Sequence, residues 1–184
     1  TVTIEDNTPP VITLIGGAVT VECGANYVDA GAFASDICSG DLTSGIVATN
    51  PVNTNAAGTY LVSYNVTDNA GNAALTVMRT VTVVDTTPPV ITRLGSASVT
   101  VECGSAYTDA GATAWDICSG DLTSSIVTDS NVNTNAVGGY TVTYNVQDTA
   151  GNAAVEVSRT VNVVDTTAPV ITLIGDSEVI INLG

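Results

Sequence analysis

The stretch DNTPPVIT at residues 6–13 returns as DTTPPVIT at 85–92 and as DTTAPVIT at 165–172. Between the first two copies, three further motifs recur in the same order: VECG at 21–24 and 101–104, DICSGDLTS at 36–44 and 116–124, and AGNAA at 70–74 and 150–154. Self-similarity at a fixed period indicates a repeat architecture. The copies of the opening stretch begin 79 and 80 residues apart, so the sequence predicts a tandem array with that period.

The repeat also predicts the domain boundaries. Residues 6–84 and 85–164 are expected to be two complete repeats. Residues 1–5 resemble the last strand of a repeat, because Thr1–Ile4 matches Thr80–Val83, and residues 165–184 match only the opening of one. We therefore expect the chain to be a segment of a longer array, with the end of a preceding repeat at 1–5 and the start of a third at 165–184.

Within each repeat the hydrophobic pattern has the period of β-strands. Tyr60, Val62, Tyr64 and Val66 alternate with Leu61, Ser63, Asn65 and Thr67, and Gly, Pro, Asn and Asp clusters separate the apolar runs. Several short strands with turn signals between them predict an all-β fold built as a two-sheet sandwich. Ala30, Ala32 and Ala34 recur as Ala110, Ala112 and Ala114, which predicts that this face of their strand is packed.

The opposite face of that strand carries different residues in the two copies. Phe33 in the first repeat and Trp115 in the second are therefore expected on the surface. They are candidate contact points for a ligand or partner. Isolated exposed apolar side chains are also common without any function, so both interpretations stay open.

The charge balance excludes several kinds of chemistry. Eighteen acidic residues face only three arginines, for a net charge of −15, so the chain repels nucleic acid and anionic membranes. The absence of His and Lys excludes a histidine base, a histidine metal ligand and a lysine Schiff base. Paired carboxylates could serve a glycosidase, but acids repeated identically in turns are not typical of an active site. We expect a protein without catalysis.

Four cysteines stand in two pairs of identical spacing, Cys23 with Cys38 and Cys103 with Cys118. An even number of paired cysteines favours disulfides in an extracellular protein over free thiols or a zinc site, which usually uses Cys-x-x-Cys hooks. The equal spacing predicts the bonds Cys23–Cys38 and Cys103–Cys118, each within one repeat. No apolar run is long enough to span a bilayer, so we expect no direct membrane insertion.

Arg79 and Arg159 occupy equivalent positions in the last strand of each repeat, in register with apolar residues. Strict alternation would direct both guanidinium groups into the core, which is costly without a partner. Either a bulge turns them outward or a carboxylate meets them. We expect an ion pair on the surface of the sandwich.

The motifs together resemble a known family. The series DTTPPVIT, Tyr-x-Asp-Ala-Gly-Ala, GDLTS, Gly-x-Tyr-x-Val-x-Tyr-Asn-Val and Asp-x-Ala-Gly-Asn is similar to the bacterial Ig-like surface repeat, which occurs in large adhesins and some crystal toxins and is related in pattern to hyalin-type repeats. The resemblance covers nearly the whole chain. It implies tandem immunoglobulin-like (cadherin-like) β-sandwiches at a cell surface, used as a spacer or an adhesive stalk, and it implies no catalytic residues.

In such a sandwich, the acidic turns of each repeat are expected at the end where the chain enters. Carboxylate and amide oxygens on loops are ligands that Ca²⁺ prefers, although the same residues also make turn hydrogen bonds. Both interpretations stay open: turn hydrogen bonds alone, or calcium at the repeat junctions. The candidate ligands for calcium are Asp6, Asp36, Asp41, Asp68 and Asn72 in the first repeat and Asp85, Asp116, Asp121, Asp148 and Asn152 in the second.

Two functions remain open on these grounds. The first is an extracellular structural spacer or stalk, whose partners are neighbouring repeats and other copies in a fibre. The second is a module that binds a glycan or a protein. The terminal segments are apolar, and free strand-forming segments of this kind invite pairing with another chain.

Overall fold

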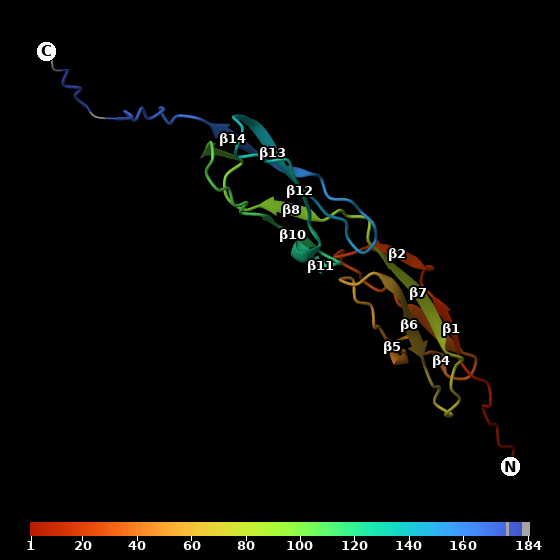
Figure 1. Cartoon of the computed structure of the whole chain (residues 1–184). Helices are drawn as coiled ribbons and strands as arrows, with labels where there is room; N and C mark the ends of the chain where they lie inside the picture. The colour runs from red at the N-terminus through yellow and green to blue at the C-terminus, as the bar shows by residue number, and fades with distance from the viewer. Residues whose placement is uncertain (176, 182–184) are drawn as a thin grey trace. The chain divides into compact units, whose positions relative to one another are not determined.

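The computed structural model describes residues 1–175 and 177–181, and nearly all of its regular structure is β (Figure 1). The strands of the first repeat are β1 (Val11–Leu14), β2 (Val19–Glu22), β3 (Ala32–Asp36), β4 (Gly40–Asp41), β5 (Val47–Thr49), β6 (Gly58–Asn65) and β7 (Val77–Val84). The second repeat has β8 (Val90–Arg93), β9 (Ser98–Glu102), β10 (Ala112–Asp116), β11 (Gly120–Asp121), β12 (Val127–Ser130), β13 (Gly138–Asn145) and β14 (Val157–Val164). Short 3-10 turns lie at Thr43–Gly45 and Thr123–Ser125. The predicted all-β fold class is confirmed.

Each repeat contains a three-stranded and a four-stranded sheet. In the first repeat the strand orders are β1-β3-β4 and β2-β7-β6-β5, and in the second they are β11-β10-β8 and β12-β13-β14-β9. The chain changes sheet between β1 and β2 at Gly16, whose φ of 84° lies in the left-handed region that glycine adopts without strain. After this change β2 runs parallel to β7, with Glu22 opposite Val84.

These registers define two ends of the first repeat. Val11, at the start of β1, lies opposite Ser35, so the turn after β3 lies where the chain enters the repeat. We call this the leading end. The ends of β2 and β7 lie side by side where the chain leaves, and we call this the trailing end. The second repeat has the same two ends, because Glu102 of β9 lies opposite Val164 of β14.

The core of the first repeat follows the period-two pattern of the sequence. Val62, Tyr64 and Val81 are fully buried, and Ile12 and Ala34 from the other sheet pack against them. Burying each such side chain contributes about 1.5–3 kcal/mol. Ala32 and Ala34 lie on the packed side as predicted, whereas Phe33 is exposed, because neighbouring side chains of a strand point to opposite faces. The prediction is wrong for Ala30 and Ala110, which are exposed because they lie in the loops before β3 and β10.

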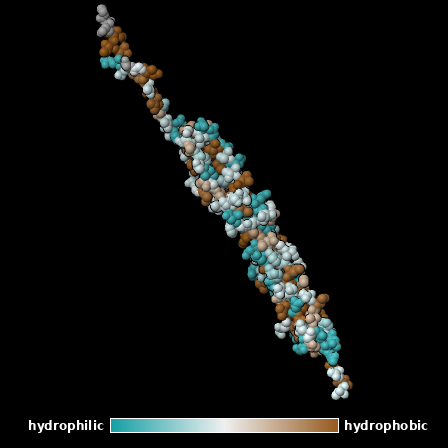
Figure 2. All heavy atoms as spheres, turned by 60° about the horizontal axis from the view of Figure 1, so that its bottom comes forward, coloured by the Kyte–Doolittle hydropathy of each residue, from teal (hydrophilic) through white to brown (hydrophobic). Residues whose placement is uncertain are grey.

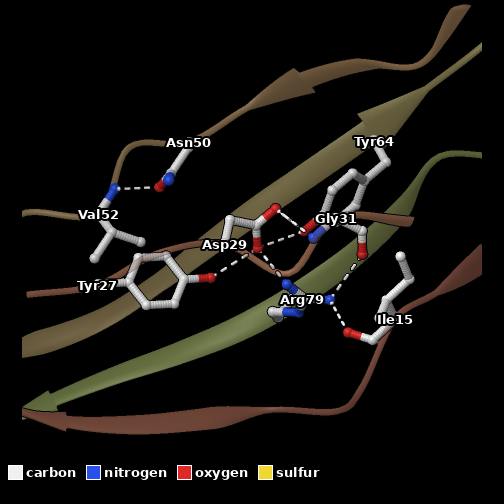
Figure 3. A network of polar contacts seen from close by, with 8 residues as sticks. All are labelled: Ile15, Tyr27, Asp29, Gly31, Asn50, Val52, Tyr64 and Arg79. Carbon is white, nitrogen blue, oxygen red and sulfur yellow. Dashed lines mark hydrogen bonds and ion pairs between the residues drawn. The ribbon is translucent and has the colours of Figure 1, made fainter. Parts of the chain in front are cut away.

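Arg79 forms the expected ion pair with a carboxylate, but the prediction that this pair lies on the surface is wrong. Its side chain is 1% exposed and pairs with Asp29, which also accepts hydrogen bonds from the hydroxyls of Tyr27 and Tyr64 at 2.8 and 2.7 Å (Figure 3). The second guanidinium nitrogen donates to the backbone carbonyl oxygens of Ile15 and Gly31 at 2.6 and 2.9 Å. These partners compensate the loss of water around a buried charge, so β7 needs no bulge.

The second repeat carries an equivalent ion pair. Arg159 is 2% exposed and its Nη1 lies 2.9 Å from Oδ1 of Asp109, while the Tyr107 hydroxyl donates to the same carboxylate at 2.8 Å. Arg159 also donates to the carbonyl oxygen of Leu94, as Arg79 does to Ile15. The buried pair is therefore part of the repeat itself.

The segments outside the two sandwiches form no strand in the part that the structure describes. Residues 1–10, 165–175 and 177–181 have no regular structure. The C-terminal segment exposes several large apolar side chains, including Ile171 and Ile174. Figure 2 shows brown, hydrophobic spheres along this segment. That these segments belong to further repeats stays a prediction.

By contacts, the chain divides into two compact units. One comprises Thr1–Thr92, Ala112–Val127 and Tyr144–Val157, and the other Arg93–Gly111, Thr128–Thr143 and Ser158–Gly184. The leading end of the second repeat thus belongs to the same compact unit as the first repeat. Among the described residues, no helix has the length and apolar character needed to cross a membrane.

Candidate functional site

Three carboxylates meet at the leading end of the second repeat. Asp85 comes from the segment that joins the repeats, Asp116 from the end of β10 and Asp148 from the loop before β14. One oxygen of each lies within 4.8 Å of the others, and Asp116 and Asp148 are only 3% and 8% exposed. Three acids brought together from distant parts of the repeat form the most concentrated negative charge in the described structure.

Asp85 is the member of this cluster whose pKa is raised by burial and by the neighbouring negative charges. Burial raises the pKa of Asp85, and the negative charges of Asp116 and Asp148 raise it further. One of its carboxylate oxygens, Oδ2, is buried and has no hydrogen-bond partner among the described residues. Burial also acts to raise the pKa of Asp148, but hydrogen bonds from the side chain and backbone of Asn152 outweigh it and hold that pKa below its usual value.

Hydrogen bonds hold the cluster in place. Asp116 accepts the backbone N–H groups of Cys118 and Ser119 at 2.8 and 2.7 Å. The amide nitrogen of Asn152 donates to Asp148 at 2.8 Å and to the carbonyl oxygen of Asp85 at 3.1 Å. Asn152 therefore ties the joining segment to the loop, and its amide nitrogen serves as a donor at this site.

The leading end of the first repeat brings together a different set. Asp6, Asp36 and the thiol of Cys38 lie within the same 4.8 Å limit. Asp68 and Asn72 repeat the hydrogen bonds of their counterparts, and Asn72 donates to the carbonyl oxygen of Asp6 at 3.1 Å. The charge of Asp6, with burial and the charges of Asp36 and Asp68, raises the pKa of the Cys38 thiol.

Three of the predicted carboxylate ligands, Asp41, Asp68 and Asp121, lie outside both clusters of described residues. Asp41 and Asp121 each accept the backbone N–H of the threonine two residues later, at 2.9 Å. Asp41 and Asp121 thus make the turn hydrogen bonds that were the alternative to metal binding in the sequence analysis. The candidate contact residues Phe33 and Trp115 are 59% and 62% exposed; Phe33 lies near the start of β3 and Trp115 near the end of β10.

The disulfide in the structure is different from the predicted pairs. Cys23 is bonded to Cys118, with their Cα atoms 5.9 Å apart, and Cys38 and Cys103 are free thiols. The predicted bonds Cys23–Cys38 and Cys103–Cys118 are therefore wrong. The reason lies in strand direction: the N–H of Cys23 donates to Val84 at the trailing end, whereas Cys38 lies in the turn after β3 at the leading end. The length of β7 alone separates the ends by about 23 Å, far beyond disulfide reach.

Beside this bond, Gly24 and Ile117 are in close contact. A Cβ added to Gly24 would lie 2.3 Å from Cδ1 of Ile117, so a larger residue at this position would force the isoleucine side chain to shift. The φ of Gly24 is 75°, which also favours glycine. The residues next to both bonded cysteines thus pack against one another.

Sequence reasoning did not identify Glu22, which holds the joining segment at the trailing end. Its carboxylate accepts the backbone N–H and the hydroxyl of Thr86 at 2.7 and 2.9 Å and the hydroxyl of Thr87 at 3.1 Å. The Thr86 backbone hydrogen bond is the main reason why the pKa of Glu22 lies below its usual value. The signal was present in the sequence, because Glu102 and Thr166 repeat the arrangement.

Comparison with known proteins agrees with this architecture. The model of the Ig-like domain of bacterial surface proteins matches at residues 12–83 and again at 91–163. Hyalin of Strongylocentrotus purpuratus is 35% identical over 191 residues, covering 94% of this chain and 15% of that protein. Hyalin of Lytechinus variegatus is 32% identical over 190 residues, covering 97% of this chain and 35% of that protein. The chain thus spans well under half of either relative.

Among solved structures, the lipoprotein BT2262 from Bacteroides thetaiotaomicron is 28% identical with a TM-score of 0.39, covering 44% of this chain and 40% of that one. The two family matches coincide with the two sandwiches, each from its first strand to its last. The chain belongs to the family of Ig-like domains of bacterial surface proteins.

Proposed function

We propose that this chain is an extracellular structural spacer whose consecutive repeats are held in fixed register by a covalent bond. The observation that carries the proposal is the Cys23–Cys118 disulfide, which joins the trailing end of one repeat to the leading end of the next. A covalent bond at this place limits bending between the repeats, which suits a spacer. Disulfides persist in oxidising surroundings, which supports a place outside the cell.

The contacts around the bond support the same role. Glu22 holds Thr86 and Thr87, and Asn152 holds Asp85, so both ends of the joining segment are fixed. Pro88 and Pro89 follow directly, and proline restricts backbone rotation. The segment between the repeats thus has few free torsions, and this suits a stiff connection better than a hinge.

Small-angle X-ray scattering tests the spacer. We expect the oxidised chain to give one narrow distribution of dimensions and Cys23→Ser/Cys118→Ser to give a broader one, because the covalent restraint is lost. Cys38→Ser is the matched control and should scatter as the wild type does. Equally broad distributions for the oxidised wild type and the double variant would contradict a stiff spacer.

The alternative is a module that binds a glycan or a protein through Phe33 or Trp115, the exposed rings on β3 and β10. A glycan array with the oxidised chain decides between the two functions. We expect no specific binding. A hit that is lost in Trp115→Ala or Phe33→Ala would replace the spacer with the binding module.

We further propose that the cluster of Asp85, Asp116 and Asp148 binds Ca²⁺. Calcium takes six to eight oxygen ligands, of which these carboxylates supply three or more and water the rest. The support is the raised pKa of Asp85 and its unpartnered Oδ2, since a cation would relieve both the repulsion and the missing contact.

Isothermal titration of the oxidised chain with calcium chloride tests this site. Binding should be abolished by Asp85→Asn, which removes the unpartnered carboxylate oxygen and keeps the carbonyl that Asn152 binds. Asp121→Asn, in a turn of the same repeat, is the matched control and should bind as the wild type does. Binding that survives Asp85→Asn would place the ion elsewhere.

A further inference from the structure

The Cys23–Cys118 disulfide and the acidic cluster share one turn. Oδ1 of Asp116 accepts the backbone N–H of Cys118 at 2.8 Å and that of Ser119 at 2.7 Å. The bonded cysteine therefore belongs to the turn that orients Asp116, a carboxylate of the cluster that is only 3% exposed. A change at Cys118 acts directly on the backbone groups that hold this carboxylate.

The other cysteine lies beside the segment that carries Asp85. Cys23 donates its backbone N–H to the carbonyl oxygen of Val84 at 2.7 Å, and Val84 directly precedes Asp85 in the chain. Glu22, the neighbour of Cys23, accepts the backbone N–H of Thr86 at 2.7 Å. The residues on both sides of Asp85 are thus held by Cys23 and its neighbour.

The disulfide therefore joins two parts of the cluster's frame. The segment of Asp85 is held at Cys23, the turn of Asp116 contains Cys118, and the S–S bond links the two. A second link comes from the amide nitrogen of Asn152, which donates to Asp148 at 2.8 Å and to the carbonyl oxygen of Asp85 at 3.1 Å. Of these two links, the S–S bond is the one that reduction breaks.

The frame holds together groups that repel one another. Burial, and next the negative charges of Asp116 and Asp148, raise the pKa of Asp85. Oδ2 of Asp85 is buried and has no hydrogen-bond partner among the described residues. With the S–S bond in place, one oxygen of each carboxylate stays within 4.8 Å of the others, as a shared cation requires. Without the bond, the segment and the turn can move apart and relieve the repulsion.

We propose that reduction of Cys23–Cys118 weakens calcium binding at the cluster of Asp85, Asp116 and Asp148. The inference rests on the calcium site proposed above and adds the regulation of that site. A ligand that prefers one of two states shifts the equilibrium between them by the ratio of its two affinities, and this coupling is reciprocal. Bound Ca²⁺ therefore makes the disulfide harder to reduce by the same factor.

A low-molecular-weight thiol such as glutathione performs the reduction. Its thiolate attacks one sulfur of the S–S bond and forms a mixed disulfide, and the other cysteine leaves as a thiolate. A second glutathione thiolate attacks the mixed disulfide and releases the first cysteine. The bond takes up two electrons and two protons, and two glutathione molecules become one glutathione disulfide. Cys118 is partly exposed and Cys23 is only 5% exposed, so attack at Cys118 is favoured.

Calcium titration of the two oxidation states tests the coupling. The chain is prepared as Cys38→Ser/Cys103→Ser, which leaves Cys23 and Cys118 as its two cysteines. Isothermal titration with calcium chloride is run on the oxidised form, and on the reduced form after removal of the reductant under nitrogen. The dissociation constant should rise about tenfold on reduction, a coupling of ordinary size between two sites. Equal constants would overturn the proposal and leave the calcium site standing, whereas no binding by the oxidised chain would overturn both.

The reciprocal measurement uses the same chain in glutathione redox buffers. With saturating calcium chloride, the reduction potential of Cys23–Cys118 should fall by about 30 mV, which corresponds to a tenfold change in a two-electron equilibrium. Potassium chloride at equal ionic strength controls for charge screening and should give a smaller shift. A shift that potassium chloride reproduces in full would show that calcium acts by screening and would overturn the proposal.

Two variants separate the coupling from a general effect of calcium on the fold. In Asp85→Asn the reduction potential should no longer respond to calcium, because the unpartnered carboxylate oxygen is gone. Asp121→Asn, whose carboxylate makes a turn hydrogen bond outside the cluster, should respond as the parent chain does. Equal responses of the two variants would place the coupling elsewhere and overturn the proposal.

The fold of the reduced chain is checked by circular dichroism. The far-ultraviolet spectrum should be the same before and after reduction, because the buried residues of each repeat come from that repeat's own strands. A reduced chain that has lost its β-structure would overturn the proposal, since the calcium affinity would then be lost with the fold and not through the frame.

Discussion

Cys23 and Cys118 are separated by 95 residues in the sequence, and their Cα atoms lie 5.9 Å apart. The bond closes a loop that contains most of the first repeat and the first part of the second. Because Gly24 and Ile117 pack beside it, the covalent link and the apolar contact act on the same joint. The first two predictions concern this joint.

Replacing both cysteines, Cys23→Ser/Cys118→Ser, should lower the free energy of unfolding. In the chain-entropy model a closed loop of roughly 100 residues contributes about 4.7 kcal/mol. We expect the single transition of the oxidised chain in guanidinium chloride to separate into two, as the repeats lose their link. Cys103→Ser, which removes a free thiol, is the control. A double variant as stable as this control would contradict the structural role of the bond.

Gly24→Ala should destabilise the chain more than Gly104→Ala. Both glycines have a positive φ, so each substitution carries a similar backbone cost of about 1–2 kcal/mol. Only at Gly24 does the added Cβ also meet Ile117. The difference between the two variants in thermal or chemical unfolding therefore isolates the contact at the joint. Equal losses would mean that Ile117 moves aside without cost.

Asp29→Asn should destabilise the first repeat strongly, because it leaves the guanidinium of Arg79 buried without its counter-charge. Removing one partner of a buried pair costs about 3–5 kcal/mol. The double variant Asp29→Leu/Arg79→Met should recover much of this loss, since no charge stays buried. Chemical unfolding of the wild type, Asp29→Asn and the double variant measures the effect, with Asp41→Asn as a surface control. If the double variant is no more stable than Asp29→Asn, the loss of stability comes from disturbed packing and not from the unpaired charge.

The Asp29–Arg79 pair also predicts how the stability of the fold depends on pH. Burial acts to raise the pKa of Asp29, but hydrogen bonds from Tyr64 and Tyr27 and the charge of Arg79 outweigh it and hold the pKa below its usual value. A carboxyl with a depressed pKa in the folded state stabilises the fold above its unfolded pKa of about 3.9. That contribution is lost as the pH falls through the folded pKa. When the free energy of unfolding is measured from pH 6 downward, the loss of stability should begin below about pH 4. Asp29→Asn should make the free energy of unfolding depend less on pH in this range.

The contribution of Asp85 to stability depends on pH with the opposite sign to that of Asp29. Its pKa is raised in the folded state by burial and by Asp116 and Asp148, so its contribution is present below its unfolded pKa and is lost as the pH rises through the folded value. In the presence of a chelator at pH 7, Asp85→Asn should therefore raise the melting temperature. With millimolar calcium the wild type should become more stable while the variant does not respond. A variant that melts below the wild type in chelator would show that the carboxylates do not repel one another.

Much of the fold could be predicted because repeat period and alternation depend on local sequence. The spacing of DTTPPVIT predicted a tandem repeat, and the family model matches twice, at residues 12–83 and 91–163. The alternation from Tyr60 to Val66 identified a strand whose Val62 and Tyr64 are fully buried. The acidic turns also contained the residues that meet at the leading ends. Which of them meet was not predictable, since Asp121 makes only a turn bond while Asp85 joins the cluster from the segment between the repeats.

The sequence by itself determined the repeat, the strands and the residues of each turn, because these follow from side-chain periodicity and local backbone preference. Only the tertiary structure decided the disulfide partners and the place of Arg79. Equal spacing made Cys23 and Cys38 look like a pair, but β2 and β3 run in opposite directions, so the two thiols lie at opposite ends of the sandwich. Alternation directed Arg79 inward, and whether a carboxylate would meet it there depended on the loop that brings Asp29 from 50 residues away. Contacts of this range are set by strand order and direction, which periodicity does not contain.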